Sequence, residues 1–243
     1  QRWLYEVSQQ RLSKSGVELP AYTSFREAGW HKLPLPDKQN IMFADFRRDP
    51  DKYPLKTPSG KIEVFSSTVA GFAYDDCLGH PAWFVPPEWL GAAENTYPLH
   101  LLSNQPRTKL HSQLDQGLVA AAAKIKGREE VLMHKKDAAA RGIDEGDVIR
   151  LFNTRGAIYV GVRITDRIRP GVVMVPTGAW LDPDKDDPCL CKHGNPNMLA
   201  PDRPTSKLAQ GPAAHSCLVQ AEAVDQTCLP EVTAFIPPVI EKR

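Results

Sequence analysis

The 243-residue sequence lacks any long hydrophobic run and any excess of charge of one sign. Its longest purely apolar run extends only from Leu118 to Ala123, whereas a helix that crosses a bilayer needs roughly 20 apolar residues. Lysine and arginine total 30 against 29 aspartates and glutamates, so the formal net charge is +1. The sequence therefore predicts a chain without a membrane span, and it argues against a general electrostatic attraction to nucleic acid.

Cysteine is scarce, and its pattern favours reduced thiols over a disulfide framework because the number is odd and the spacing irregular. The five residues are Cys77, Cys189, Cys191, Cys217 and Cys228. Cys189, Cys191 and His193 alternate as if on one face of a strand, but ligands at every second position would crowd one another and no C-x2-C pair is present. We therefore predict no metal site in this chain. Reduced thiols favour the cytoplasm over the periplasm as its compartment.

Motifs of hydrolysis and of nucleotide binding are also missing. The sequence has no G-x-S-x-G nucleophile elbow, no Walker A loop and no G-x-G-x-x-G loop. The glycines of GDVIRLFNTRG lie ten positions apart and belong to a predicted hairpin instead of a strand-to-helix turn. A hydrolase and a Rossmann nucleotide fold are therefore disfavoured, and we predict no catalytic residue in this chain.

What the sequence does contain is proline, 22 residues in all, which divides it into segments. Apolar residues from Trp3 to Leu12 recur at near-helical intervals, so residues 1 to about 30 predict one amphipathic helix with a loop behind it. Residues 29–98 are loop-rich, with a turn at 58–60, a strand-like alternation over 61–65 and then a proline-broken connector. The tryptophans Trp83, Trp89 and Trp180, with Phe84, are more typical of core or interface positions than of ligand platforms.

From about residue 95 onward the signals are those of β-structure. Apolar or alternating segments predict strands over 99–102, 147–152, 157–164 and 172–176, with a hairpin turn at 153–156. A short helix is expected in KKDAAARG, where Gly142 can end it in the left-handed conformation.

Polar side chains concentrate in two stretches that follow or interrupt these apolar segments. The first stretch, LHLLSNQPRTKLHSQLDQG, contains Ser103, Asn104, Gln105, Arg107, His111, Ser112 and Gln113. The second, CLCKHGNPNMLAPDRPTSKLAQG, contains His193, Asn195, Asn197, Lys207 and Gln210. Amides, hydroxyls and cationic groups can hold a phosphate and the edge of a heterocycle without a metal. A plain surface loop is the alternative interpretation of each stretch.

Long ordered motifs add a family resemblance. They are YPLHLLSNQPRTKLHSQLDQG, GREEVLMHKKDAAARGIDEGDVIRLFNTRGAIYVGVRITDRIRPGVVMVPTGAW and CKHGNPNMLAPDRPTSKLAQG. These stretches resemble the C-terminal molybdopterin-dinucleotide-binding domain of the dimethyl sulfoxide reductase family, in particular its biotin/methionine sulfoxide reductase and trimethylamine N-oxide reductase branch. Upstream, ADFRRDPDKYPLKTPSGKIEVFSSTVAGFAYDDCLGHPAWFVPPEWLG resembles the segment that leads from the catalytic body into that domain.

The resemblance implies a mainly β fold. Residues 95–243 would form a double-psi β-barrel that binds molybdopterin guanine dinucleotide, and residues 1–94 would form a loop-rich α+β segment, the C-terminal end of the catalytic body with its connector. The two polar stretches become contacts to bis(molybdopterin guanine dinucleotide), with Arg107, Lys109 and Lys207 near its pyrophosphates. Pro204 stands where the family has a glycine before Thr-Ser, so one backbone donor is lost there.

The implied function is the cofactor-binding C-terminal portion of an oxidoreductase that reduces a small S-oxide or N-oxide. Molybdenum would be held by the pterin dithiolenes and by a missing N-terminal catalytic portion, in the same polypeptide or in a separate chain, so this chain alone is expected to be inactive. Two alternatives stay open. One is a stand-alone molybdopterin-binding or carrier module without reductase activity, and the other is a structural remnant that binds nothing.

Overall fold

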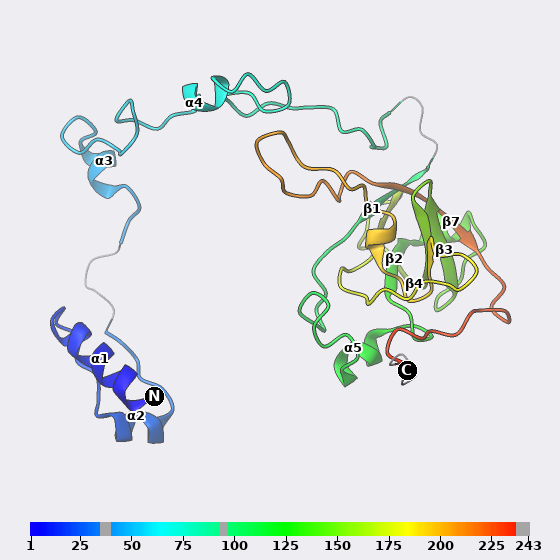
Figure 1. The fold of residues 1–243 in the computed structure, drawn as a ribbon, viewed down its shortest axis with the longest axis horizontal. Coiled ribbons are helices and arrows are strands. Elements are labelled where there is room, and N and C mark those ends of the chain that lie inside the picture. Colours follow the sequence, from blue (N-terminus) through cyan, green and yellow to red (C-terminus); the bar gives the residue numbers. More distant parts are fainter. Residues whose placement is uncertain (35–39, 93–96, 237–243) are drawn as a thin grey trace, which may run out of the picture. The chain divides into compact units, whose positions relative to one another are not determined.

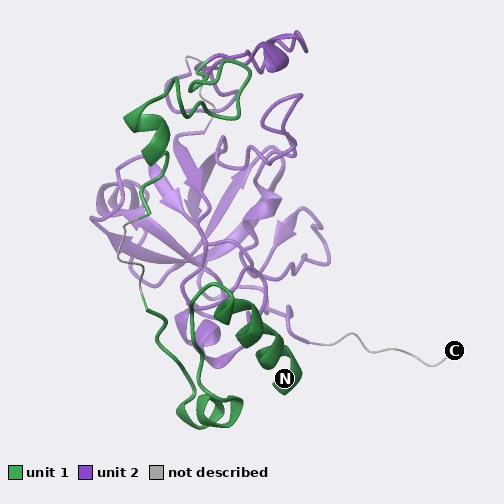
Figure 2. Cartoon of the chain, turned by 90° about the vertical axis from the view of Figure 1, so that its left-hand side faces the viewer, with its two compact units in different colours: residues 1–64 green, residues 65–243 purple. Residues whose placement is uncertain are grey.

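The computed structural model describes residues 1–34, 40–92 and 97–236, and the chain divides into two compact units (Figure 2). The N-terminal unit comprises residues 1–64, and the barrel unit comprises residues 65–243. The predicted boundary between residues 94 and 95 lies outside the described residues and stays a prediction.

The described residues of the N-terminal unit form the helices α1 (Arg2–Ser13), α2 (Tyr22–Ala28) and α3 (Ala44–Arg48). The prediction of one helix followed by a loop is therefore wrong, because a second helix forms directly after Pro20-Ala21. Gly29 ends α2 in the left-handed conformation (φ 76°) and donates its N–H to the carbonyl of Phe25, which is the usual role of glycine at a helix end. Tyr5 of α1 stacks on Phe25 with ring centroids 4.9 Å apart.

The strand expected over residues 61–65 is absent, so that prediction is also wrong. The segment before it folds back as a turn in which the N–H of Leu55 donates to the carbonyl of Gly60 (2.8 Å). Ile62 and Val64 remain 68% and 74% exposed. An alternating pattern becomes a strand only where a neighbouring strand accepts its hydrogen bonds, and the described residues offer none here. The short helix α4 (Ser67–Ala70) follows, capped by the Ser66 hydroxyl.

Within its described residues, the barrel unit contains seven strands. They are β1 (Leu99–Leu102), β2 (Glu130–His134), β3 (Val148–Asn153), β4 (Gly156–Thr165), β5 (Val172–Met174), β6 (Leu190–Cys191) and β7 (Leu218–Ala223). The order β2-β5-β1-β7-β3-β4 closes on itself because β4 also pairs with β2, and β6 adds to β4 outside this ring. Figure 1 labels β1, β2, β3, β4 and β7 of this unit. The predicted mainly β barrel is confirmed.

The four strands predicted from the sequence all occur, with ends shifted by a residue or two. Asn153 pairs with Gly156 at the predicted hairpin turn between β3 and β4. The predicted helix is α6 (Lys135–Ala139), and Gly142 just after it has φ 62°. The sequence did not predict β2, β6 and β7, nor the helix α5 (Leu118–Ala123) and the 3-10 turn η1 (Pro196–Met198).

The barrel interior is an aliphatic core that fixes the ends of the strands. Leu101, Ile149, Ile158 and Val173 are all at most 2% exposed, and each such side chain contributes about 1.5–3 kcal/mol by burial. Since β1 and β5 are parallel, with His100 opposite Val172, their carboxyl ends lie at the same edge of the barrel. None of the helices in the described parts of the chain combines the length and the apolar character that a bilayer crossing requires.

Candidate functional site

Three loops that follow strands of the barrel unit line one cavity. The first, residues 103–117, follows β1; the second, residues 175–181, follows β5; the third, residues 192–197, follows β6. The pairing of β1 and β5 continues into the loops, because the N–H of Val175 donates to Leu102 (3.0 Å) and that of Thr177 donates to Asn104 (2.9 Å). The fold thus brings together residues that are far apart in the sequence.

A cavity of about 550 Å³ lies between these loops, and we call it the site cavity. Its lining comprises His111, Ser112, Thr177, Gly178, Ala179, Trp180, Leu181, Asn195 and Asn197. It therefore joins two residues of the first polar stretch, His111 and Ser112, to two of the second, Asn195 and Asn197. The Asn195 side chain also accepts the backbone N–H of Asn197 (3.0 Å), which orders the turn η1 at the cavity wall.

Glycine at position 178 is required by close backbone approach. A Cβ atom there would lie 1.8 Å from the carbonyl oxygen of His111, and Gly178 itself has φ +93°. His111 has φ 50°, inside a turn that is closed by a hydrogen bond from the Gln113 N–H to Leu110. The Trp180 indole then donates to the carbonyl of Ser112 (2.7 Å). The first two loops are therefore in direct contact along the cavity.

A buried group of four charges lies beneath these loops, and we call it the ion cluster: Lys109, Lys124, Asp115 and Glu129. Asp115 accepts from Lys109 (2.6 Å) and Lys124 (2.8 Å), and Glu129 accepts from Lys109 and, at 3.2 Å, from Lys124. All four side chains are at most 7% exposed. Burial alone would raise the pKa of Asp115, but the hydrogen bonds from the two lysines outweigh it and lower the pKa.

The ion cluster also connects the loops to one another. The second carboxylate oxygen of Asp115 accepts the backbone N–H of Trp180 (2.9 Å), so the first loop holds the second. Lys109 was expected near a pyrophosphate. In the structure its ammonium is buried against two carboxylates, so it neutralises them instead.

His193 anchors the third loop and is fully buried. Its Nδ1 lies 2.9 Å from the carbonyl of Trp180, and because a carbonyl only accepts, Nδ1 carries the proton in this contact. Nε2 has no hydrogen-bond partner. Burial, followed by the charge of Lys124, lowers the pKa of His193, which favours the neutral ring. The carbonyl of His193 accepts the N–H of Glu129 (3.0 Å), and this bond ties the third loop to the ion cluster.

The donors and acceptors that remain unused fit an organic cofactor better than a metal. Thr177 Oγ1, which lines the site cavity, is buried without a hydrogen-bond partner, and so are Asn104 Oδ1 and Ser103 Oγ outside that lining. Such atoms are normally satisfied by a partner or a ligand. The lining of the site cavity contains amides, a hydroxyl pair, an imidazole and an indole but no lysine, arginine or carboxylate. The cavity therefore suits an uncharged, hydrogen-bonding heterocycle.

Cationic groups line a second cavity close by, of about 180 Å³. Asn104, Arg107, Arg163 and Arg167 contribute to it, together with Glu129 and Glu130. Glu129 belongs to the ion cluster and Glu130 pairs with Arg163 (2.9 Å). Arg107, a predicted site residue, is thus placed beside Asn104 and away from His111 and Ser112.

The remaining predicted residues lie outside the lining of these two cavities. Gln105 contacts His111, with Nε2 and Nδ1 3.3 Å apart, and Gln113 is exposed. Lys207 donates to Asp75 (2.7 Å), which raises its pKa, and Gln210 reaches only the carbonyl of Lys207. Their loop is a narrow hairpin in which Pro204 pairs with Pro212. Within the second polar stretch, Asn195 and Asn197 therefore lie at the site cavity, whereas Lys207 and Gln210 do not.

Sequence reasoning missed the loop after β5. Thr177, Gly178 and Ala179 line the cavity, and the signal that could have revealed them is the glycine that follows a buried strand in VPTGAW. Trp180, interpreted as a core or interface residue, is 38% exposed and forms part of the cavity wall. Across the described residues no group of three or more histidine, cysteine, aspartate or glutamate side chains is arranged to hold a metal.

Comparisons with known proteins show which family the barrel unit resembles. Residues 99–218 match the model of the family described as "Molydopterin dinucleotide binding domain". Over 98% of its length the chain is 43% identical to trimethylamine-N-oxide reductase 1 of Escherichia coli O157:H7, and it spans 29% of that protein. It is 42% identical to biotin sulfoxide reductase of Cereibacter sphaeroides over 91% of its length, spanning 30% of that protein.

A third curated relative is dimethyl sulfoxide/trimethylamine N-oxide reductase of Cereibacter sphaeroides, 40% identical over 90% of the chain and 27% of the relative. The chain thus spans less than a third of the length of these relatives. Among solved structures, acetylene hydratase from Pelobacter acetylenicus superposes with a TM-score of 0.59 over 84% of this chain and 28% of that one. At 20% identity that likeness concerns the fold alone.

Proposed function

Residues 99–218 belong to the Molydopterin dinucleotide binding domain family, and from this premise we propose that the chain is the cofactor-binding C-terminal part of a molybdenum enzyme that reduces S-oxides or N-oxides. The observation that carries the proposal is the site cavity, because residues of both polar stretches line it. The names of the relatives supply the substrate class, since they are reductases of trimethylamine N-oxide, dimethyl sulfoxide and biotin sulfoxide.

The chain's own residues bind and orient the cofactor. Thr177, Asn195 and Asn197 offer hydrogen bonds to its uncharged heterocycle, and Gly178 lets the His111 backbone pack closely against the second loop, which shapes the cavity. Arg107 meets negative charge in the adjoining cavity. When bound, the molybdenum cofactor supplies the two-electron redox change that removes an oxygen atom from the substrate, and the protein tunes and positions it.

The finer form of the cofactor is part of the proposal. We take it to be bis(molybdopterin guanine dinucleotide), with molybdenum held by the pterin dithiolenes and by an N-terminal catalytic portion corresponding to the longer part of the relatives. No residue of this chain is assigned a catalytic role. The five thiols are free, which favours the cytoplasm over the periplasm as the compartment.

The proposal is tested by supplying the missing portion. The chain is fused behind the N-terminal part of the Escherichia coli trimethylamine-N-oxide reductase, in place of that enzyme's matching segment, and expressed in cells that make the cofactor. Molybdenum, pterin and GMP released by hydrolysis are measured per chain, and oxygen removal is assayed with trimethylamine N-oxide, dimethyl sulfoxide and biotin sulfoxide.

We expect the fusion to contain the cofactor with GMP and to reduce at least one of these substrates, whereas the 243-residue chain alone has no turnover. Cofactor content without turnover in a folded fusion would favour the carrier-module alternative. A folded fusion without pterin would contradict the proposal, and turnover by the purified chain alone would show that the catalytic residues are not all upstream.

A further inference from the structure

The segment after β7 contacts the second and third loops. It falls outside the residues matched by the family model, which end at 218. We call residues 230–236 the strap; it is the red segment near the C-terminal end of the barrel unit in Figure 1. Arg128, which is 4% exposed, donates to the carbonyl of Pro230 at the start of the strap.

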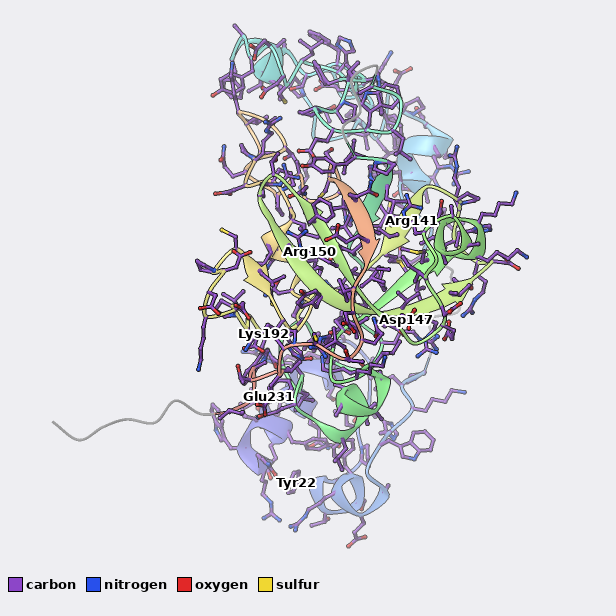
Figure 3. All side chains as sticks on the ribbon, turned by 90° about the vertical axis from the view of Figure 1, so that its right-hand side faces the viewer. Tyr22, Arg141, Asp147, Arg150, Lys192 and Glu231 are labelled. Atoms are coloured by element: carbon purple, nitrogen blue, oxygen red, sulfur yellow. The ribbon has the colours of Figure 1, made fainter. Side chains whose placement is uncertain are left out.

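Thr233 is the central attachment point of the strap. Its backbone N–H and its hydroxyl donate to the two oxygens of Asp182, at 2.7 and 2.6 Å. Lys192 donates to the same hydroxyl (2.9 Å) and lies 3.4 Å from Asp182. Figure 3 labels Lys192 of the third loop and Glu231 of the strap. Asp182 and Lys192 are 4% and 6% exposed, so these polar contacts are shielded from water and correspondingly strong.

The strap thereby reaches the residues that form the site cavity. Asp182 follows Leu181, a lining residue, and Lys192 precedes His193. The Phe235 ring packs edge-to-face against Trp180, with centroids 5.4 Å apart, and against His193 at 5.0 Å. Trp180 and His193 are joined by their own hydrogen bond. Phe235 therefore touches both partners of the hydrogen bond that connects the second loop to the third.

We propose that the strap fixes the Trp180 wall of the site cavity, with Thr233 and Phe235 as positioning residues that slow the release of the bound cofactor. This proposal rests on the proposed function for the identity of the ligand. Neither residue lines the cavity, so both act through Trp180 and the backbone at Asp182. Without Phe235, Trp180 keeps its indole bond to Ser112 but loses the packing on its other side, and the cavity wall becomes mobile.

The test compares Phe235→Ala, Phe235→Tyr and Thr233→Val. Phe72→Ala, which removes an aromatic ring 46% exposed elsewhere in the barrel unit, serves as the control. Two measurements are made on each variant. NMR titration of the His193 ring in the full chain, assigned with His193→Gln, reports the packing without any cofactor. Pterin release from the loaded fusion during dialysis reports the retention of the ligand.

In Phe235→Ala we expect the depressed pKa of His193 to move back toward its ordinary value, because the ring that covers it is gone. Pterin release should become about tenfold faster, the scale of a lost aromatic pair. Thr233→Val should show a smaller acceleration, Phe235→Tyr should behave as wild type, and Phe72→Ala should change neither quantity. If Phe235→Ala fails to fold, Thr233→Val decides the outcome by the same two measurements.

Unchanged pterin release in a variant whose His193 pKa has moved would overturn the positioning role while leaving the proposed function intact. An unchanged His193 pKa in Phe235→Ala would show that the strap does not pack on the loops. A wild-type fusion that holds no pterin would refute the proposed function and the claim about retention together, and the His193 titration would still decide whether the strap packs on the loops.

Discussion

The two units differ in what they bury. In the barrel unit, β-strands enclose a core in which Leu101, Ile149 and Val160 have at most 2% exposure. In the N-terminal unit, none of the described residues is buried, and Trp3 and Trp30 are each 70% exposed. Short helices gain most of their stability from packing of an apolar face, and exposed apolar side chains in quantity mark an interaction surface. The barrel unit thus contains its own stabilising contacts, whereas the N-terminal unit leaves its large apolar side chains exposed.

The largest difference between the units should appear in amide hydrogen exchange. We expect amides of α1 and α2 to exchange almost as fast as in an unfolded chain. Amides of β3 and β4 should be protected by about 10³-fold or more, because they open only with the whole barrel, whose unfolding costs at least about 5 kcal/mol. Mass spectrometry of the full chain after timed exchange measures both. Comparable protection of amides in the two units would contradict the claim that only the barrel unit is stabilised by its own core.

Within the barrel unit, the ion cluster should be the most sensitive polar feature. Asp115→Asn leaves Lys109 and Lys124 with a single carboxylate and is expected to cost about 3–5 kcal/mol of unfolding free energy. Asp166→Asn is the matched control, since Asp166 is 61% exposed and pairs only at the surface with Lys135 and His134. Urea unfolding followed by far-UV circular dichroism measures both variants. A cost below about 1 kcal/mol for Asp115→Asn, the range of a surface ion pair, would show that the cluster does not hold the loops.

The lowered pKa of Asp115 also predicts how the free energy of unfolding changes at acidic pH. Because the folded pKa of Asp115 is lowered, its contribution is present above the pKa of the unfolded chain and is lost as the pH falls through the folded pKa. Wild type should therefore lose stability on acidification more steeply than Asp115→Asn, and unfolding titrations at a series of acidic pH values provide the measurement. Parallel profiles for the two proteins would refute this assignment.

Two glycines make it possible to measure backbone strain and steric clash separately. Gly142 has φ +62° and a Cβ atom added there would meet nothing within 4 Å, whereas at Gly178 that atom would meet the carbonyl of His111. Gly142→Ala should cost about 1–2 kcal/mol, the penalty for an L-residue in the left-handed region. Gly178→Ala should cost more and should also displace the His111 turn. Thermal unfolding and chemical shifts of residues 110–113 test this pair, and equal effects of the two substitutions would contradict the close approach.

In the connector we expect an effect no larger than that of Gly142→Ala. Glu88 pairs with Arg155 through both carboxylate oxygens, at 2.6 and 2.9 Å, and also accepts the N–H of Leu218. Arg155 in turn donates to the carbonyl of Leu199, next to η1. Glu88→Gln keeps the shape and removes the charge, so we expect a loss of about 1–2 kcal/mol. Protease cleavage of residues 86–90 should become faster while β3 and β4 stay intact, and an unaltered cleavage rate would show that this pair does not hold the connector.

The sequence predicts those elements that depend on neighbouring residues and misses those that depend on pairing with distant ones. Strands β1, β3, β4 and β5 and the turn at 153–156 are predictable because alternation and turn residues act over a few positions. The false strand at 61–65 has the same alternation, and only the absence of a pairing partner among the described residues excludes it. Strand β7 could not be found from LVQAEA, since its pairing with β3 and β1 depends on residues far along the chain.

In the site, too, locally determined features were predictable and features that depend on distant residues were not. His111, Ser112, Asn195 and Asn197 were predictable as polar residues of loops, and they line one cavity. The buried roles of Lys109 and His193 were not predictable, because nothing local distinguishes a lysine that meets a phosphate from one that meets two buried carboxylates. The contribution of residues 177–180 depends on the parallel pairing of β1 with β5.

The central claim is that the site cavity holds the cofactor and not the substrate. The most direct test measures both the cofactor content and the KM for the substrate in variants of the fusion enzyme. Ser112→Ala and Asn197→Ala are compared with Ser67→Ala, an exposed serine outside the cavity. We expect lower pterin and molybdenum content in the first two variants, at about 1–3 kcal/mol for each hydrogen bond left unmade, with an unchanged KM for the loaded fraction. Full cofactor content together with a strongly raised KM would place these residues at the substrate and contradict the account.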